Sequence, residues 1–376
     1  MTLKFGGTPK RDGNMRNPVA GLILVASGIF ASGGAGADDF YRGKTLSILV
    51  NFTTGGPTDV EARLVARHIG KHIAGSPNIV VRNMGGASGV VGMNWLGEIA
   101  APDGLTAGYF TGAASKTAIG EAGLRVDLAK YSFVASGPGL LVTYMRTDVS
   151  PGLKVPADIM KTRDFWAAGL LPGTDKDVRT RMQLDMLGIR YHYISNYPGS
   201  AEARLALERN EIQMYTESMP TYRSAVEPNL VKTGAAIPIC FDPLDDGETL
   251  SRAPEADGIG AKPFHELLLE VKGALPKGEM WEAYRLINFL GSTLIRAIVM
   301  PPGSPREAVS ALKSALAALD TDADYRADAL NVIKFVPRYV VDDKMEKLFR
   351  EKLTPDPKLQ AFISAYVEAG RASLGK

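Results

Sequence analysis

Three turns rich in glycine, threonine and serine carry the strongest chemical signal in the sequence. They lie at residues 53–59, 85–92 and 172–175, and each is expected to follow a strand and to open a helix. A turn of this kind presents free backbone N–H groups and the positive end of a helix dipole, which together bind anions. Glycine also lets the backbone approach a ligand closely. One such turn could be no more than a tight turn, but three of them predict a site for a small anion.

Other kinds of site fit the sequence less well. Residues 86–92 have the spacing G-x-x-G-x-x-G, whereas dinucleotide binding needs G-x-G-x-x-G, and no phosphate-loop Gly-Lys-Ser/Thr occurs. Ser88 lacks the second glycine of a nucleophile elbow, because Val90 stands in its place. His68 and His72 lie four residues apart on an expected helix without a nearby third ligand. We therefore expect no catalytic residues, no metal and no cofactor.

The overall composition bears on the kind of partner. Basic and acidic residues nearly balance, with 43 Lys and Arg against 41 Asp and Glu, and no basic stripe is interleaved with aromatic residues. A nucleic-acid partner is therefore not expected. Cys240 is the only cysteine, so an intrachain disulfide is impossible, and its apolar surroundings predict a buried side chain.

The N-terminus has the pattern of a secretory signal peptide. Basic residues precede an apolar run at 19–30, and small residues lead to an Ala-x-Ala site that ends at Ala37. The run is well short of the ~20 residues that a membrane-spanning helix needs. We expect cleavage after Ala37 and a periplasmic location, with translation starting at Met1 or Met15. The alternative is a buried N-terminal helix.

Strands and helices alternate around the turns. Buried strands are expected at 46–52, 78–82 and 105–110, with a helix at 57–73 and another that ends near residue 100. This alternation predicts a parallel sheet with crossover helices. The pattern then restarts, which predicts a second α/β unit and a cleft between the two. Its expected strands are 140–145, 165–171, 191–194, 212–216 and 234–241, and later elements are helices at 278–290, 306–319, 343–352 and 358–369 around a strand at 295–300.

The sequence also resembles a known family. Residues 40–64 contain an aromatic start, a strand and Thr-Gly-Gly-Pro-Thr-Asp. They are similar to the opening of the Bug (TctC-like) receptors of tripartite tricarboxylate transporters, in which Pro-Gly-Gly-x-x-Asp follows the first strand. Residues 100–105 match the Ala-Pro-Asp-Gly-Tyr turn of these receptors. The likeness spans most of the chain after the leader and is strong over residues 40–110. Further similar segments lie at residues 81–89, 197–202, 211–214 and 300–306.

This resemblance implies a type II periplasmic-binding-protein fold, in which two α/β lobes enclose a ligand cleft. One lobe would hold residues 38–140 and 243–376, and the other would hold residues 141–242. The implied protein is a monomeric, non-catalytic receptor that captures a small organic anion, a mono- or dicarboxylate, and delivers it to inner-membrane permease subunits. Carried over by position, the ligand-binding residues are Phe52, Thr53, Thr54, Gly55, Gly56, Ala87, Ser88, Thr111, Gly112, Gly173, Thr174, Tyr197 and Glu217.

Several departures from the family leave alternatives open. Thr54 replaces a proline, Leu-Leu-Pro at 170–172 replaces a stretch rich in Ser and Gly, and the region 242–292 is longer than in the family. Lys116 is either a partner for a second carboxylate or an ordinary exposed lysine. An exported hydrolase or isomerase with a dispersed active site is one rival function. A ligand sensor that acts on a membrane kinase is another.

Overall fold

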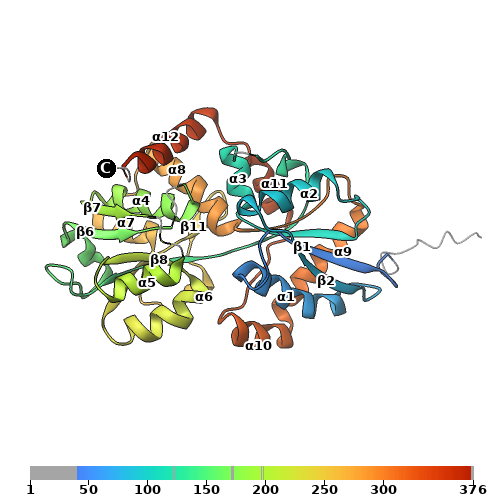
Figure 1. Ribbon diagram of the computed structural model, residues 1–376, viewed down its shortest axis with the longest axis horizontal. Coiled ribbons are helices and arrows are strands. Elements are labelled where there is room, and N and C mark those ends of the chain that lie inside the picture. Colours follow the sequence, from blue (N-terminus) through green and yellow to red (C-terminus); the bar gives the residue numbers. More distant parts are fainter. Residues whose placement is uncertain (1–39, 122, 171–172, 196, 198, 374–376) are drawn as a thin grey trace, which may run out of the picture. The chain divides into compact units, whose positions relative to one another are not determined.

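The computed structural model describes residues 40–121, 123–170, 173–195, 197 and 199–373. The predicted signal peptide lies outside the described residues, as do Leu171 and Pro172 of the third turn. In the described part, the longer strands form two sheets, which are the bases of the two predicted lobes (Figure 1). No helix of this part is both long enough and apolar enough to cross a membrane.

The first sheet has five strands and mixed direction. β1 pairs in parallel with β2 and with β3, as the alternating pattern predicts. β13 instead runs antiparallel to β3 and β4, because the chain returns from the second sheet at the edge where β3 ends. The predicted parallel arrangement therefore holds for β1, β2 and β3, and β13 runs in the opposite direction. In their order across the sheet the strands are β2 (Asn78–Asn83), β1 (Thr45–Val50), β3 (Thr106–Thr111), β13 (Arg296–Met300) and β4 (Ser132–Gly137).

Helices connect and flank these strands to complete the first lobe. α1 begins at Pro57, where a proline suits the first helical position because its missing N–H would have no helical partner. α3 and α10, like β4, lie in segments for which the sequence predicted no regular element. The helices of this lobe are α1 (Pro57–Ile69), α2 (Val90–Glu98), α3 (Ala113–Ile119), α9 (Arg306–Ala318), α10 (Ala323–Val332) and α11 (Asp343–Lys352).

The second sheet has six strands and defines the second lobe. Its last strand, β12, pairs in parallel with β9. The prediction placed the segment from residue 243 onward in the first lobe, whereas in the structure β12 pairs with the second sheet and the chain returns to the first sheet at β13. The order of strands is β12 (Lys262–Pro263), β9 (Ala236–Phe241), β5 (Leu141–Arg146), β8 (Met214–Ser218), β6 (Phe165–Ala168) and β7 (Tyr191–Ile194).

Helices of both α and π type pack around the second sheet. α8 packs against α4, so the segment that is long for the family belongs largely to this lobe. Within that segment β10 (Leu244–Asp245) pairs antiparallel with β11 (Leu250–Ser251). The helices are α4 (Asp175–Leu187), α5 (Ser200–Glu208), α6 (Met219–Thr221), η6 (Tyr222–Val231), α7 (Phe264–Lys272), α8 (Glu279–Asn288) and η8 (Phe289–Thr293).

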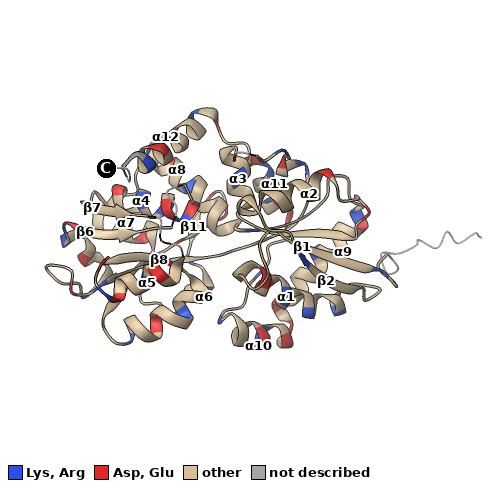
Figure 2. Cartoon of the chain, viewed as in Figure 1, with Lys and Arg blue, Asp and Glu red and all other residues tan. Residues whose placement is uncertain are grey.

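Burial of apolar side chains joins the two lobes. One large cluster contains Phe110 and Phe133 from the first lobe together with Phe165 and Tyr284 from the second. Cys240 belongs to it and is only 2% exposed, which confirms its predicted burial. Basic and acidic residues are interspersed along the ribbon, so neither sign dominates in this view (Figure 2).

His68 of α1 and His72 of the 3-10 turn after it form hydrogen bonds with carboxylates of the segment around α10. His68 Nε2 lies 2.9 Å from Asp328 Oδ2, and His72 Nε2 lies 2.7 Å from Asp322 Oδ2. Asp322 also accepts hydrogen bonds from Lys71 Nζ and from the backbone N–H of Tyr325, so it caps α10 and connects that helix to the 3-10 turn after α1. Burial alone would raise the pKa of the Asp322 carboxyl, but the hydrogen bonds from Lys71 and His72 outweigh burial and lower this pKa.

Replacing Asp322 with asparagine should lower the free energy of unfolding at pH 7 by about 1–2 kcal/mol, because the cap survives and the charged hydrogen bonds do not. The folded pKa of Asp322 lies below its unfolded value of about 3.9, so this contribution is present above about pH 4 and is lost as the pH falls further. Urea unfolding of both proteins between pH 3 and pH 7 measures it. Asp324→Asn is the control, since the Asp324 side chain is 81% exposed. Equal losses for the two variants, or a difference that does not shrink in acid, would contradict the prediction.

Candidate functional site

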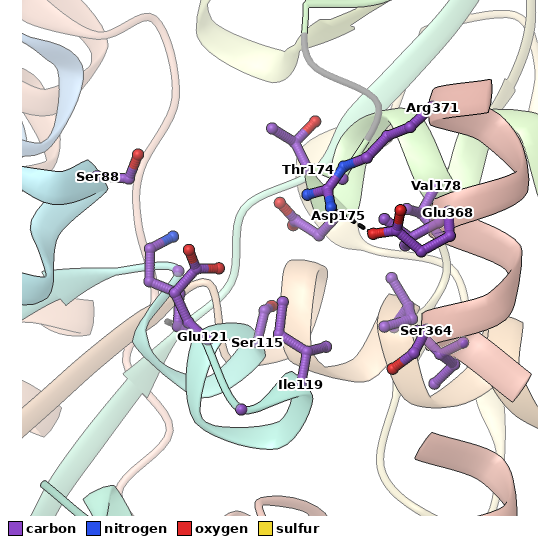
Figure 3. A pocket seen from close by; sticks show the side chains of 17 residues that line it. Ser88, Ser115, Ile119, Glu121, Thr174, Asp175, Val178, Ser364, Glu368 and Arg371 are labelled. Carbon is purple, nitrogen blue, oxygen red and sulfur yellow. Dashed lines mark hydrogen bonds and ion pairs between the residues drawn. The ribbon is translucent and has the colours of Figure 1, made fainter. Parts of the chain in front are cut away.

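A cavity of about 480 Å³ lies at the carboxyl ends of the first-lobe strands, where the start of α4 faces them. This volume is in the range of small-molecule pockets. Parts of both lobes and the C-terminal helix α12 (Pro357–Ser373) form its walls (Figure 3). Its polar lining from the first lobe and from α4 comprises Ser88, Gly112, Ser115, Lys116, Glu121, Gly173, Thr174 and Asp175.

The first turn, between β1 and α1, is held by a side chain of its own helix. Gly55 N–H donates to Asp59 Oδ2 at 2.8 Å, and Asp59 also accepts from Arg63 and Asn83. Burial would raise the pKa of the Asp59 carboxyl, but these hydrogen bonds lower it below its usual value. The N–H group of Gly55 therefore already donates to the Asp59 carboxylate and is not available to a ligand. None of the residues 52–56 lines the cavity.

The second turn packs against the end of β1. A Cβ added to Gly89 would lie 2.4 Å from Asn51 Nδ2, and one added to Gly92 would lie 2.9 Å from Met84 O. The glycine spacing of this turn thus serves close packing rather than phosphate binding. Ser88, at the tip, has a φ of +53° and lines the cavity, whereas Ala87 beside it does not.

Asn51 joins the ends of two parallel strands. Its Nδ2 donates to Thr111 O at 3.1 Å, and its Oδ1 accepts from Thr111 N at 3.0 Å. Asn51 is fully buried, so both polar ends of its amide are satisfied inside the protein. Thr111 Oγ1 forms a hydrogen bond with Thr58 Oγ1 at 2.7 Å, and Thr111 does not line the cavity. The hydrogen bonds between Asn51 and Thr111 therefore fix the carboxyl ends of β1 and β3, from which the turns begin.

α3 brings a hydroxyl and a cation to the cavity. Gly112, with a φ of +66°, turns the chain from β3 into α3. Ser115 is 8% exposed, and its Oγ has no hydrogen-bond partner in the described part of the chain. A Cβ added to Gly112 would lie 3.6 Å from Lys116 Nζ, so the ammonium group reaches back over the start of the helix. Lys116 is half-buried and lines the cavity, and no salt bridge pairs it with another described residue.

The start of α4 forms the opposite wall. Thr174 Oγ1 accepts from Asp177 N at 3.4 Å and caps the helix, as Ser and Thr commonly do. A Cβ added to Gly173 would lie 3.1 Å from Arg371 Nη2, so the Arg371 guanidinium covers this helix end. Arg371 is ion-paired with Glu368 on α12. Burial raises the pKa of Asp177, beneath this turn, to about 6.

Two predicted ligand residues of the second lobe lie elsewhere. Glu217 is 1% exposed and accepts from Arg204 Nη1 at 3.2 Å, while burial raises the pKa of its carboxyl. Tyr197 is half-buried and packs against the apolar cluster of its own lobe. Of the predicted ligand residues, the cavity therefore brings together Ser88, Gly112, Gly173 and Thr174. It does not include Phe52, Thr53, Thr54, Gly55, Gly56, Ala87, Thr111, Tyr197 or Glu217.

Comparison with solved structures finds the same fold in several proteins. A TctC solute binding protein from Polaromonas, solved without ligand, has a TM-score of 0.62 at 18% identity, over 88% of this chain and 99% of that one. The chain has a TctC-type fold. This result confirms the predicted two-lobed α/β architecture. MatC from Rhodopseudomonas palustris with bound malate (TM-score 0.54, 18% identity, 85% of this chain and 99% of that one) shares the fold. A protein of the same organism, solved with adipate, also shares the fold (TM-score 0.55, 16% identity, over 89% of this chain and 98% of that one).

In sequence, Protein BugT from Bordetella pertussis (strain Tohama I) is 39% identical over 88 residues. The match covers 23% of this chain and spans a quarter, 25%, of the length of BugT. No family model matches the chain. The partial match to BugT and the TctC-type fold support the predicted resemblance to the Bug and TctC receptors.

In this TctC-type fold, sequence reasoning missed most of the cavity wall that the second lobe and α12 supply. Lys116 could be considered from sequence, because it lies four residues after a glycine that follows a strand. No local signal places α12 beside α3 and α4, since that contact joins segments far apart in the chain. The wall residues that were not anticipated are Ser115, Ile119, Gly120, Glu121, Asp175, Val178, Ile287, Ile363, Ser364, Val367, Glu368 and Arg371.

A buried arginine anchors α4 to the segment that returns to the first lobe. Arg179, 1% exposed, donates to Asp242 Oδ2, to Ser292 Oγ at 2.7 Å and to Gly291 O at 3.1 Å. Burial raises the pKa of the Asp242 carboxyl, and the Arg179 guanidinium opposes that rise. Ser292 O in turn accepts from Gly139 N at 2.8 Å, where β4 crosses to β5. Arg179 thus connects the cavity wall at α4 with both chain crossings between the lobes.

Proposed function

We propose that this chain is a periplasmic solute-binding protein that captures a small organic carboxylate and passes it to a tripartite tricarboxylate-type transporter, without catalysis. The observation that carries the proposal is the convergence of Ser88, Gly112 and Lys116 with the start of α4 around one cavity. The TctC-type fold supports it, as do malate and adipate in two proteins of that fold. The partial match to BugT agrees with this assignment.

The proposed mode of binding relies on directed hydrogen bonds. The ligand carboxylate accepts from backbone N–H groups at the turns and from the Lys116 ammonium group, and hydrogen bonds to charged groups are about twice as strong as neutral ones. The N-terminus of α4 adds a favourable dipole from the other side of the cavity. Closure of the two lobes about the crossings near Gly139 and Ser292 would exclude water and strengthen these bonds.

The exported protein should gain thermal stability from carboxylates and should leave them unaltered. We would screen mono-, di- and aromatic carboxylates by thermal shift, because a ligand at 100 times its Kd stabilises the folded state by about 2.7 kcal/mol. Mass spectrometry of the recovered ligand separates a receptor from a hydrolase or isomerase, which would change it. Stabilisation only by compounds without a carboxylate would overturn the proposal. A permease gene pair beside the gene would favour transport over signalling to a membrane kinase.

The same proposal includes the location, the partners and the oligomeric state. Residues 1–37 act as a cleaved signal peptide, the mature monomer works in the periplasm, and the permease subunits receive the closed form. N-terminal sequencing of protein from the periplasmic fraction tests the cleavage site. A mature chain that starts at Asp38 supports the proposal, and an uncleaved chain in the cytoplasm contradicts it.

A further inference from the structure

On α3 and α4, the cavity lining changes from polar near the start of the helix to aliphatic one turn later. On α3, Ser115 and Lys116 precede Ile119, which lies one turn further along the helix. On α4, Thr174 and Asp175 precede Val178 in the same way. Residues three or four apart on a helix share a face, so each helix presents its polar groups first and an aliphatic group after them. Figure 3 shows Ile119 and Val178 toward α12, with Ser88 on the opposite side.

α12 continues this division. Ile363 and Val367 both line the cavity, and Arg371 follows them on the same face of the helix. Val367 and Arg371 both approach Gly173, since a Cβ there would lie 3.3 Å from Val367 Cγ1 and 3.1 Å from Arg371 Nη2. The charged end of this face thus joins the polar layer at the start of α4, and its aliphatic part faces the apolar layer. Ile287 of α8 completes the apolar layer.

The position of α12 is set by contacts with both lobes. Gln360 Nε2 donates to Ala118 O of α3 at 3.0 Å, and Tyr366 Oη donates to Asp185 Oδ2 of α4 at 2.6 Å. The Tyr366 ring also lies 4.8 Å from the Arg181 guanidinium. The apolar layer is therefore a built wall, held by hydrogen bonds at each side.

From this division we infer that the ligand is a carboxylate with a hydrocarbon body, aliphatic or aromatic, rather than a hydroxylated acid. The inference rests on the proposed function and narrows its ligand class. The carboxylate lies in the polar layer near Lys116, and the body packs against Ile119, Val178, Ile287, Ile363 and Val367. Each buried methylene raises affinity about fourfold. Hydroxyl groups on the body would lose their water partners, and the five aliphatic side chains of this layer offer no hydrogen bonds in return, although Ser364 of α12 also lines the cavity.

Two pairs of acids, each matched in carbon number and charge, test the inference by calorimetry on the mature chain. Hexanoate is compared with gluconate, and adipate with galactarate. We expect the hydrocarbon member of each pair to bind at least 10-fold more tightly. Equal or tighter binding of gluconate and galactarate would overturn the inference while leaving carboxylate capture intact. If none of the four acids and no aromatic carboxylate binds, the proposed function fails as well.

A matched pair of variants locates the hydrocarbon body. Val367→Thr keeps the side-chain volume and adds a hydroxyl to the apolar layer, whereas Val309→Thr makes the same change at a half-buried position of α9 outside the cavity lining. We expect Val367→Thr to weaken binding of hexanoate and adipate about 3- to 10-fold, and Val309→Thr to leave it unchanged. The same affinity in both variants would overturn the placement of the ligand body against α12.

Discussion

Replacing Lys116 with alanine should lower the affinity for a carboxylate ligand by about 10- to 100-fold, the effect of losing one charge-assisted hydrogen bond in a partly enclosed site. Lys116 lines the cavity and is half-buried. Two acids of the opposite wall are already engaged: Glu368 pairs with Arg371, and Asp175 Oδ2 lies 3.3 Å from Arg179 Nη2. The ammonium group of Lys116 is thus placed to meet a ligand anion.

Calorimetry with adipate, or with the tightest acid of the thermal-shift screen, measures the loss. Lys130→Ala is the matched control, because the Lys130 side chain is 75% exposed and lies outside the cavity lining. The affinity of the Lys116 variant should also depend less on ionic strength, since one charge interaction is gone. If both variants bind like the unaltered protein, the ligand does not use Lys116 and the proposed carboxylate position is wrong.

Replacing Arg179 with methionine should reduce the free energy of unfolding by about 3–5 kcal/mol, because the substitution leaves Asp242 buried without its counter-charge. Asp242 is 2% exposed and also accepts a hydrogen bond from Ser292 Oγ at 3.2 Å. Arg179 bonds to the backbone at Gly291 as well, so the variant also weakens the junction between the lobes. The loss follows from uncompensated burial of charge rather than from the strength of the ion pair itself.

Urea unfolding of the mature chain measures this loss. Arg190→Met is the control, since Arg190 is 75% exposed and its nearest carboxylate oxygen, on Asp164, is 3.9 Å away. Adding Asp242→Asn to Arg179→Met should restore part of the stability, because the amide carries no charge to leave unpaired. An Arg179 variant as stable as the Arg190 variant would show that the buried pair does not hold the fold.

Local elements were predicted well where side-chain periodicity is strong. β1, β2, β3, α1 and α9 lie close to their predicted ranges. β1 and β3 are buried on both faces and are mostly apolar, whereas α1 and α9 bury one face and show helical apolar spacing. α3 and β4 were missed. α3 is only 7 residues long, too short for a helical period to show. β13 was placed correctly, but its direction depends on the path of the chain between the sheets and not on its own residues.

The candidate site was predicted in part for the same reason. Glycine-rich turns after parallel strands share one sheet edge, a rule that indicated the turns with Ser88, Gly173 and Thr174, and the family resemblance added Gly112. The rule does not indicate which N–H groups are already occupied. The N–H group of Gly55 donates to Asp59, and the Glu217 carboxylate accepts from Arg204, although the sequence left Gly55 and Glu217 as candidate ligand residues.

The glycine-rich turns by themselves predicted segments of the chain at which an anion could be held, because their chemistry is local. Glycine, hydroxyls and helix starts act over a few residues, so their pattern is legible in the sequence. Only the tertiary structure decided what surrounds them. Asn51 packs against the glycines of the second turn. α12, from the far end of the chain, supplies aliphatic side chains to the cavity wall. Such contacts join residues from separate segments of the chain, and their energy depends on complementary surfaces that no single segment encodes.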